Sequence, residues 1–578
     1  MLLQDGPKLP PVLVSQDWRL NILLIFMAVP ILTYVFSSLK SLMAIRSRKS
    51  GVRPAIVPYW LPFLGNMFAF VWDPPAFASS LTKRFGFDIP LRVRIGPFKA
   101  YVISSASHFE SILKGGKELN SNHGIVHWLV TLFGLPTETA KFYYKDNSGI
   151  GVNPTPGTDV QPENRHFHLR HSAASRLLYG SHLKGMTSRF VEKFGNQIAE
   201  NTTVQHEWVD LPDLTDYLQK EIFRSATSAL CGDYIFSLNP TFTSDFWEYI
   251  DGLGVFFKAV PRWLSPGPHR ARDRTLAAIK KWHLHAWEKT DHGTLDLGDY
   301  DPYFGAKIVK TRYTYMQAMK EMTDEARSAE DLALLSAANT NAVPATIWLI
   351  LEFLRDPSLL ERVRAEVDSA RIPSTDGQVH FDIAKLCEGV LLQSVLHETL
   401  RLRVAVGLIR IPEKKDYSLG KWLIPKGGMM FLSSALAARN GDLWNAGTAS
   451  DPHPLDEFWS DRFIIYPDRP QSGPLKEGLR SARAIDDKDK EKIDNGKPRF
   501  STEGLGGGLI AFGGGVRMCP GRFFAKNEML ASFAMLCSNF EIELKVQNGW
   551  RAEPDTRFYG VGAMPPKGKI PFRIRRRL

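Results

Sequence analysis

One segment near the C-terminal end constrains the fold more than any other, the run from Phe512 to Met529 that reads FGGGVRMCPGRFFAKNEM. Its three consecutive glycines predict a loop whose backbone can approach a flat ligand closely, because no side chain stands in the way. Cys519 and then Pro520 follow, and a proline there suits the first turn of a helix that continues beyond it. A cysteine at a helix N-terminus meets unpaired N–H groups and the positive end of the helix dipole, which favour the thiolate.

Two other interpretations of this loop stay open at the level of single residues. A lone cysteine is most often a small buried hydrophobic residue. A glycine-rich loop before a helix can also cradle phosphate, but the Gly-Lys-Ser/Thr that such a loop needs does not follow here. The four cysteines of the chain are widely scattered, so a disulfide framework is not indicated and a reducing compartment is expected.

The spacing within the segment resembles the haem signature of the cytochrome P450 family, F-x-x-G-x-R-x-C-x-G. Every position of that pattern is filled here, by Phe512, Gly515, Arg517, Cys519 and Gly521. The resemblance implies that Cys519 is the axial ligand of a haem b iron, that Arg517 binds a haem propionate and that Phe512 packs beside the thiolate. A thiolate ligand donates electron density to iron and favours cleavage of the O–O bond.

A second feature supports the resemblance. Glu398 and Arg401 lie three residues apart on a predicted helix, so their side chains share a face and can pair. Such a pair alone carries little information, but the family has an E-x-x-R pair upstream of its cysteine. The third member of that buried cluster comes from a later meander, and "FWSDRF" nominates Arg462 for it. The role that the resemblance implies for this cluster of three charged residues is structural.

The centre of the chain contains a second uncharged run, residues 332–351. Its polar residues and Pro344 predict a helix buried in the protein rather than a membrane span. Where many family members carry an acid and a threonine that relay protons, this chain has Asn339 and Thr340, which we treat as the candidate catalytic pair. An amide cannot release and regain a proton as a carboxyl group does. Because Pro344 lacks the N–H that would bond the Thr340 carbonyl, a kink is expected there.

The "ANT…P…W" form of this helix is similar to the family branch that contains the sterol 7α- and 12α-hydroxylases and prostacyclin synthase. One departure from the family pattern stands out, because the usual W-x-x-x-R that contacts the haem propionates is missing. "RHFHLRHSAASRLL" is the replacement, which makes His166, His168 and Arg170 candidates for cofactor binding.

The N-terminal region predicts a membrane anchor. Residues 20–39 carry no charge, and twenty helical residues span roughly 30 Å, which is enough for the bilayer core. Basic residues follow directly, which places the rest of the chain in the cytosol and argues against a cleaved signal peptide. The expected organisation is a non-cytosolic segment 1–19, an anchor 20–39, a basic and proline-rich hinge 40–66, and a haem-thiolate catalytic domain 67–578.

The net charge of +11 would be compatible with nucleic-acid binding. Much of the basic excess, however, follows the anchor or lies in the last residues, and no nucleic-acid module accompanies it. A membrane surface or an acidic partner protein is therefore the better interpretation, and no nucleic-acid partner is expected.

The expected fold is mainly α-helical with a small β-rich lobe, the P450 fold preceded by a transmembrane helix. The favoured function is O2- and NADPH-dependent hydroxylation or oxidation of a sterol, terpenoid or similar lipophilic molecule, including products of secondary metabolism. NADPH–cytochrome P450 reductase would dock near Arg522 and Lys526, with cytochrome b5 as an optional further partner, at the endoplasmic reticulum. The alternatives are a reductase-independent isomerase or dehydratase on the same haem, and a haem protein that binds or senses ligands without turnover.

Overall fold

The computed structural model describes residues 18–115, 118–290, 298–373, 379–479, 496–547 and 549–577. Most of the predicted N-terminal segment 1–19 therefore lies outside the described residues. The helices are α1 Trp18–Arg46, α2 Met67–Trp72, α3 Pro74–Phe85, α4 Ala106–Lys114, α5 Asn122–Thr131, α6 Thr137–Lys145, α7 His166–Leu177, α8 Gly180–Ala199, α9 Leu214–Cys231, α10 Tyr234–Leu238, α11 Phe242–Asp251, α12 Leu253–Phe257, α13 Pro266–Lys289, α14 Lys307–Ala318, α15 Asp324–Asn339, α16 Ala342–Arg355, α17 Pro357–Ser369, α18 Ile383–Leu386, α19 Val390–Arg403, α20 Ser434–Ala437 and α23 Arg522–Asn539.

A mixed sheet forms the smaller lobe, with the strand order β1-β2-β3-β13-β10-β17 and β4 paired to β10. Its strands are β1 Ala55–Ile56, β2 Leu91–Ile95, β3 Phe98–Ile103, β4 Leu119–Asn120, β10 Val404–Pro412, β13 Met429–Ser433 and β17 Val561–Ala563. The hairpin expected from the alternation in residues 90–104 is present, with Ile95 opposite Phe98 across the turn. A three-stranded sheet joins β16 Phe540–Leu544, β18 Phe572–Arg576 and β5 Val209–Leu211.

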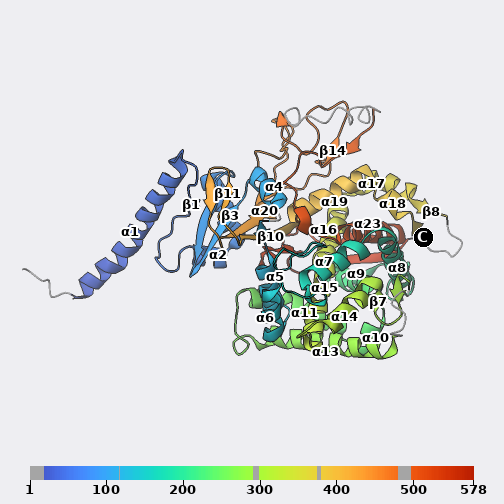
Figure 1. The fold of residues 1–578 in the computed structure, drawn as a ribbon. Helices are drawn as coiled ribbons and strands as arrows, with labels where there is room; N and C mark the ends of the chain where they lie inside the picture. The colour runs from blue at the N-terminus through green and yellow to red at the C-terminus, as the bar shows by residue number, and fades with distance from the viewer. Residues whose placement is uncertain are drawn as a thin grey trace, which may run out of the picture.

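The helices form the larger lobe, and α1 projects from the opposite, sheet-containing side of the molecule (Figure 1). The two-stranded pieces at the periphery are β6 Tyr300–Asp301 with β7 Gly305–Ala306, β8 Arg371–Ile372 with β9 His380–Phe381, β11 Tyr417–Leu419 with β12 Trp422–Ile424, and β14 Ile464–Ile465 with β15 Arg499–Phe500. The predicted fold class, mainly α with a small β-rich lobe, is confirmed.

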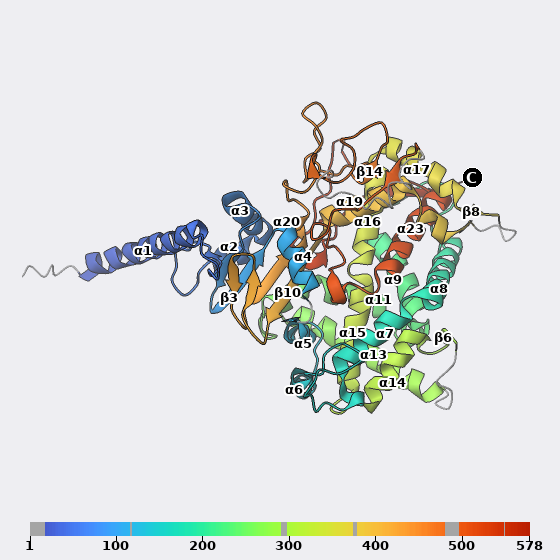
Figure 2. The same cartoon turned by 45° about the horizontal axis from the view of Figure 1, so that its top comes forward.

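The central helix runs through the helical lobe as α15 and α16 (Figure 2). Its start is well defined because Thr323 caps α15 by accepting a hydrogen bond from the N–H of Ala326, and acidic residues occupy the first turn. The stretch Asp324–Arg355 is apolar enough to cross a membrane, yet 72% of its most apolar window is buried inside the protein. The structure thus confirms a buried core helix.

The N-terminal helix, unlike the central helix, is largely exposed. Leu24–Arg46 is a candidate membrane span by length and composition, and little of it is covered by the rest of the chain. Pro30 lies inside α1 without ending it, and the helix continues past residue 39, the predicted end of the anchor. Tyr34 stacks on Trp60 at a centroid distance of 4.3 Å, and Ala55–Ile56 pairs with β2. Part of the predicted hinge 40–66 is therefore packed against the sheet lobe.

Candidate active site

The loop that carries Cys519 is held against α4. Gly515 has a φ of +65°, and a Cβ there would collide with the carbonyl oxygen of Leu113. The residue therefore has to be glycine both for its backbone conformation and for its contact. The backbone N–H of Cys519 donates to the carbonyl of Phe512 at 2.9 Å. This hydrogen bond connects the first residue of the predicted signature to its cysteine.

Helix α23 starts at Arg522, two residues later than the proline suggested, with Gly521 as its N-cap. Pro520 and Gly521 instead form a turn, and a Cβ on Gly521 would stand 3.9 Å from Cys519 Sγ. Burial raises the pKa of the Cys519 thiol, whereas the backbone N–H groups of Gly521 and Arg522 and the charge of Arg522 act in the opposite direction. The helix N-terminus thus acts in the direction that favours a thiolate, but burial is the larger effect and the pKa of the thiol is raised.

The predicted break in the central helix is confirmed. Helix α15 ends at Asn339 and α16 begins at Ala342, so Thr340 and Asn341 lie between the two helices. Pro344 offers no N–H to the Thr340 carbonyl. The Thr340 hydroxyl donates to the carbonyl of Ser336 at 2.8 Å, and this half-buried hydroxyl retains its acceptor lone pairs.

The two asparagines beside Thr340 point in different directions. Asn339 is fully buried, and its Nδ2 donates to the carbonyl of Leu335 at 2.9 Å and towards Thr227 on α9 at 3.4 Å. Asn341, in contrast, is exposed although its neighbours in α16 are buried. Its Oδ1 accepts a hydrogen bond of 2.8 Å from the N–H of Ala563. The structure therefore brings the amide of Asn341, and not that of Asn339, to the open side of the helix.

That open side is defined by helix periodicity. Leu334, Ala337, Ala338 and Asn341 are exposed or half-buried, whereas Leu335, Ser336 and Asn339 are buried. The open residues recur at intervals of three and four, so they share one helix face. The face is uncharged and carries two alanines, which leaves room beside it.

Three arginines gather on the other side of the loop. Burial, and then the charges of Arg410 and Arg170, lower the pKa of Arg517 to about 10. Arg517 donates to Asn122 Oδ1 at 2.7 Å. Arg410 lies on β10 and is buried, and Nη1 of Arg170 is buried without a hydrogen-bond partner among the described residues. Buried positive charges of this kind are unfavourable unless an anion binds to them.

His166 lies behind this cluster. It is fully buried, and its ring stacks on that of Tyr143 with the ring centroids 3.7 Å apart. Its Nε2 lies 3.5 Å from Glu330 Oε1. Burial, reinforced by Arg170 and Arg312, lowers the pKa of His166 to about 4. Burial alone would raise the pKa of Glu330, but His166, Arg170 and Arg312 lower it to about 2. A neutral histidine, His166, and an ionised carboxylate, Glu330, thus interact electrostatically with Arg170.

The buried charge cluster expected from E-x-x-R is present. Arg401 Nε donates to Glu398 Oε2 at 2.7 Å, and Arg462 Nε donates to Glu398 Oε1 at 3.0 Å. All three side chains are fully buried. Arg401 also bonds the carbonyls of Ala438 and Leu455 at 2.7 Å. The nomination of Arg462 is therefore correct, and the cluster ties α19 to the meander before the Cys519 loop.

These observations fit a haem with a thiolate ligand. Cys519 offers the sulfur, Gly515 and Gly521 keep the loop close to it, and the unmatched charges of Arg170, Arg410 and Arg517 suit two propionates.

Comparison with known proteins shows the family. The family model for cytochrome P450 matches residues 56–453 and 498–572. The chain belongs to the cytochrome P450 family. Cytochrome P450 monooxygenase fsoE of Humicola fuscoatra is 35% identical over 562 residues, covering 95% of this chain and 93% of that protein. This P450 is accordingly a monooxygenase, and haem-thiolate is its cofactor type.

More distant relatives agree with the predicted branch and fold. Cholesterol 7-alpha-monooxygenase of Cricetulus griseus is 25% identical over 343 residues, or 57% of this chain and 58% of that protein. A solved structure described as retinoic acid bound cyanobacterial CYP120A1 superposes with a TM-score of 0.60 at 17% identity. It covers 92% of this P450 and 100% of that chain, and it supports the fold.

Sequence reasoning missed three residues of this site. Asn341 was not singled out, because the family pattern draws attention to the neighbouring Asn339–Thr340 pair. Arg410 had a readable signal, since it is the one charged residue in the otherwise apolar β10, and it is buried. Glu330 gave none, because a glutamate in an acidic helix start is ordinary. Arg522 and Lys526, the proposed docking residues, are half-buried and bonded to Tyr179 and to the Cys387 carbonyl respectively.

Proposed function

We propose that this P450 inserts an oxygen atom from O2 into a bulky lipophilic substrate of the sterol or terpenoid class, using NADPH-derived electrons from a membrane-bound reductase. The observation that carries the substrate class is the open face of α15. It presents Leu334, Ala337 and Ala338 without any charge and ends at the amide of Asn341. A broad apolar ring system can lie on such a face. The similarity to a cholesterol monooxygenase supports the same class.

The residues of the chain divide the work as follows. Cys519 would hold the haem iron, and Arg170, Arg410 and Arg517 would hold the propionates. When bound, a thiolate-ligated haem supplies the activation of O2. Asn341 uses its free Nδ2 to donate a hydrogen bond to a water or substrate oxygen at the helix break, because its Oδ1 is committed to Ala563.

Thr340 is the hydroxyl available to pass a proton at this break. The described residues place no carboxyl group on the open face, so protons must reach the site through water and this hydroxyl. That feature also favours the second candidate function, a reductase-independent isomerase or dehydratase, which needs no net proton delivery.

Location at the endoplasmic reticulum membrane belongs to the same proposal. The uncovered apolar part of α1, from Leu24, would span the bilayer once. The basic residues that follow it would keep the catalytic domain in the cytosol, within reach of a reductase.

Reconstitution with purified reductase tests the proposal. The full chain is incubated with NADPH, isotopically labelled O2 and a panel of sterols and triterpenes. The expected result is a product that carries one labelled oxygen atom and depends on reductase. Formation of the same product without O2 and reductase would establish the isomerase. Saturable binding of a panel member without any product would instead support a binding protein.

A further inference from the structure

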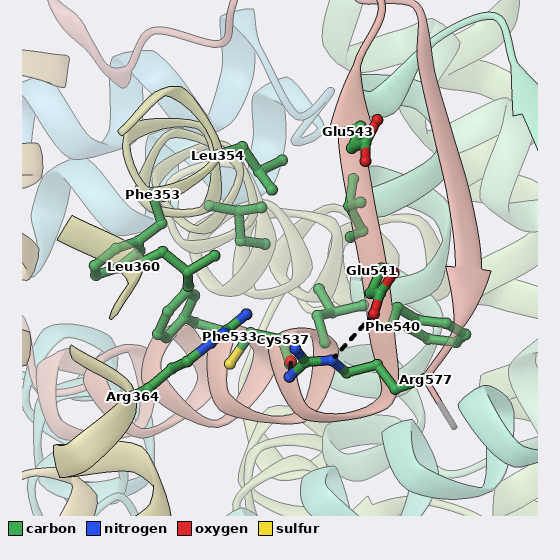
Figure 3. Close-up of a pocket in the computed structure, with 13 residues that line it drawn as sticks. Phe353, Leu354, Leu360, Arg364, Phe533, Cys537, Phe540, Glu541, Glu543 and Arg577 are labelled. Carbon is green, nitrogen blue, oxygen red and sulfur yellow. Dashed lines mark hydrogen bonds and ion pairs between the residues drawn. The ribbon is translucent and has the colours of Figure 1, made fainter. Parts of the chain in front are cut away.

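A cavity opens beside α17 and α23 (Figure 3), two helices that lie on the side of the molecule away from α1 (Figure 1). It has a volume of about 250 Å³ and lies where the C-terminal ends of α16 and α23 meet α17 and β16. From Arg522, beside the haem ligand, to Leu536 in its wall, α23 rises by about 20 Å. The cavity is therefore separate from the substrate site.

The floor of this cavity is apolar. Phe353 and Phe533 stack with ring centroids 4.1 Å apart and an interplanar angle of 22°, and both are fully buried. Leu354 and Leu360 extend the apolar surface toward the mouth (Figure 3). Packed aromatic pairs of this kind are stabilised by about 0.5–1.5 kcal/mol beyond the burial of their surface.

Two arginine side chains lie at the edge of this apolar floor. Arg364 on α17 and Arg577 at the end of β18 reach from opposite sides toward Cys537 (Figure 3). Nη1 of Arg577 donates to the Cys537 carbonyl at 3.1 Å, and its Nε lies 4.0 Å from Glu541. Nε of Arg364 is buried without a hydrogen-bond partner among the described residues. Its one recorded ion pair is with the exposed Glu361 at 3.1 Å.

The negative charges nearby are already matched. Glu541 and Glu543 line the cavity, but each is bonded across the sheet by its own arginine, Arg575 and Arg573 respectively. The thiol of Cys537 adds no negative charge, because burial raises its pKa to about 11 although the neighbouring arginines act against this. The two guanidinium groups at the mouth thus retain donors for a further anion.

We propose that this cavity is a binding site for an alkyl carboxylate, with the carboxylate between Arg364 and Arg577 and the chain on the Phe353–Phe533 floor. Arginine is suited to this contact because its planar donors match the two carboxylate oxygens. The volume lies just below the range of about 300–1,000 Å³ that is usual for ligand pockets. It therefore fits a chain of medium length and not a polycyclic substrate.

Calorimetric titration of decanoate into the full-length, haem-loaded enzyme tests this site. An azole that ligates the iron is present at saturation, so that the substrate site is blocked and its haem spectrum reports any displacement. The expected result is saturable binding of one decanoate without a change in that spectrum. Decanol, which has the same chain without the charge, should bind at least tenfold more weakly. Equal affinities for decanoate and decanol would overturn the proposal.

Three variants sharpen the outcome. Arg364→Gln and Arg577→Gln should each weaken decanoate binding tenfold or more, and Leu354→Trp should abolish it by filling the cavity. Arg551→Gln is the matched control, because Arg551 is an exposed arginine whose ion pair with Glu457 lies elsewhere. Binding that survives Leu354→Trp, or that Arg364→Gln and Arg577→Gln leave unchanged, would show that decanoate binds outside this cavity.

Discussion

The side-chain oxygen of Asn341 accepts a hydrogen bond of 2.8 Å from the backbone N–H of Ala563. This contact joins the break in the central helix to strand β17. Gly562 permits it, because a Cβ at that position would collide with the Asn341 amide. Further along α16, Trp348 donates to the carbonyl of Met564, the residue after Ala563, at 2.7 Å. The break is thus fixed in place from the sheet side, and the free Nδ2 of Asn341 has a defined direction.

Replacement of Asn341 by alanine should therefore damage both catalysis and folding. The variant leaves the N–H of Ala563 unpaired at a cost of about 1–3 kcal/mol, and it removes the amide donor from the open face. We expect product per NADPH consumed to fall about tenfold, which corresponds to roughly 1.4 kcal/mol in the transition state. The measurement is the ratio of product to NADPH in the reconstituted system.

Asn339→Ala is the matched control. Its side chain is buried against α9, so the variant should lower the midpoint of thermal unfolding and leave the ratio of product to NADPH unchanged. An unchanged ratio in Asn341→Ala together with a lowered ratio in Asn339→Ala would reverse the assignment.

Thr340→Ala should uncouple NADPH consumption from oxidation. The hydroxyl of Thr340 is the group that can pass a proton at the break, and its loss leaves substrate contacts intact. We expect NADPH oxidation to continue with more hydrogen peroxide and less product, while substrate affinity changes little. Thr340→Ser retains a hydroxyl and should preserve coupling. Under the isomerase interpretation, Thr340→Ala would change turnover without any peroxide.

Cys519→Ala should lose the absorption band that marks a thiolate-ligated haem in the reduced carbon monoxide complex. Cys387→Ala should keep that band, because the Cys387 thiol contacts Asn527 and lies outside the loop. A normal band in Cys519→Ala would refute the ligand assignment.

The sequence was most informative where chemistry depends on spacing. The loop from Phe512 to Gly521 and the Glu398–Arg401 pair with Arg462 could be predicted because their motifs resemble those of the family. The break in the central helix could be predicted because Pro344 lacks an N–H. Asn341 could not be told from Asn339 by spacing alone. The local backbone at the break decides which of two neighbouring amides faces outward.

The buried network next to Arg170 could not be predicted from the sequence, for a different reason. His166, Glu330 and Arg312 come from α7, α15 and α14, and they meet through packing between helices that leaves no periodic signal. The beginning of α23 was also predicted two residues early, since a proline can stand just before a helix as well as in its first turn.

Removal of residues 1–39 should transfer much of the protein from membranes to the soluble fraction and leave the haem spectrum intact. Some membrane association should persist, because Phe68 and Trp72 on α2 expose 60% and 92% of their surface beside α1. Adding Phe68→Ser and Trp72→Ser to the truncated protein should release the remainder in a flotation assay. Loss of haem from the truncated protein would show that the segment belongs to the catalytic fold.

The His166–Glu330 pair predicts loss of stability in acid. The pKa of His166 falls from 6.5 in the unfolded chain to about 4 in the folded protein. The unfolded chain therefore binds the proton first, so the contribution of His166 is complete above about pH 6.5 and is lost as the pH falls toward 4. The groups facing the ring include Glu330 and Asp146, which raise this pKa, and Arg170 and Arg312, which lower it.

Glu330 extends the effect to lower pH. Its pKa is depressed from 4.5 to about 2, so its contribution is present above pH 4.5 and is lost as the pH falls below that value. Between pH 7.5 and 5.0 the histidine dominates, and its full shift is worth roughly 3 kcal/mol.

His166→Phe should remove the first of these two steps, since phenylalanine can stack on Tyr143 and carries no titrating nitrogen. The measurement is the urea midpoint of the haem-loaded enzyme at pH 7.5 and pH 5.0. The wild type should lose more stability over this interval than His166→Phe, while His127→Phe, a change at an exposed histidine, should behave as the wild type. Equal losses in the wild type and His166→Phe would mean that the ring of His166 is not the group that titrates, and the acid sensitivity would then have to arise elsewhere in the fold.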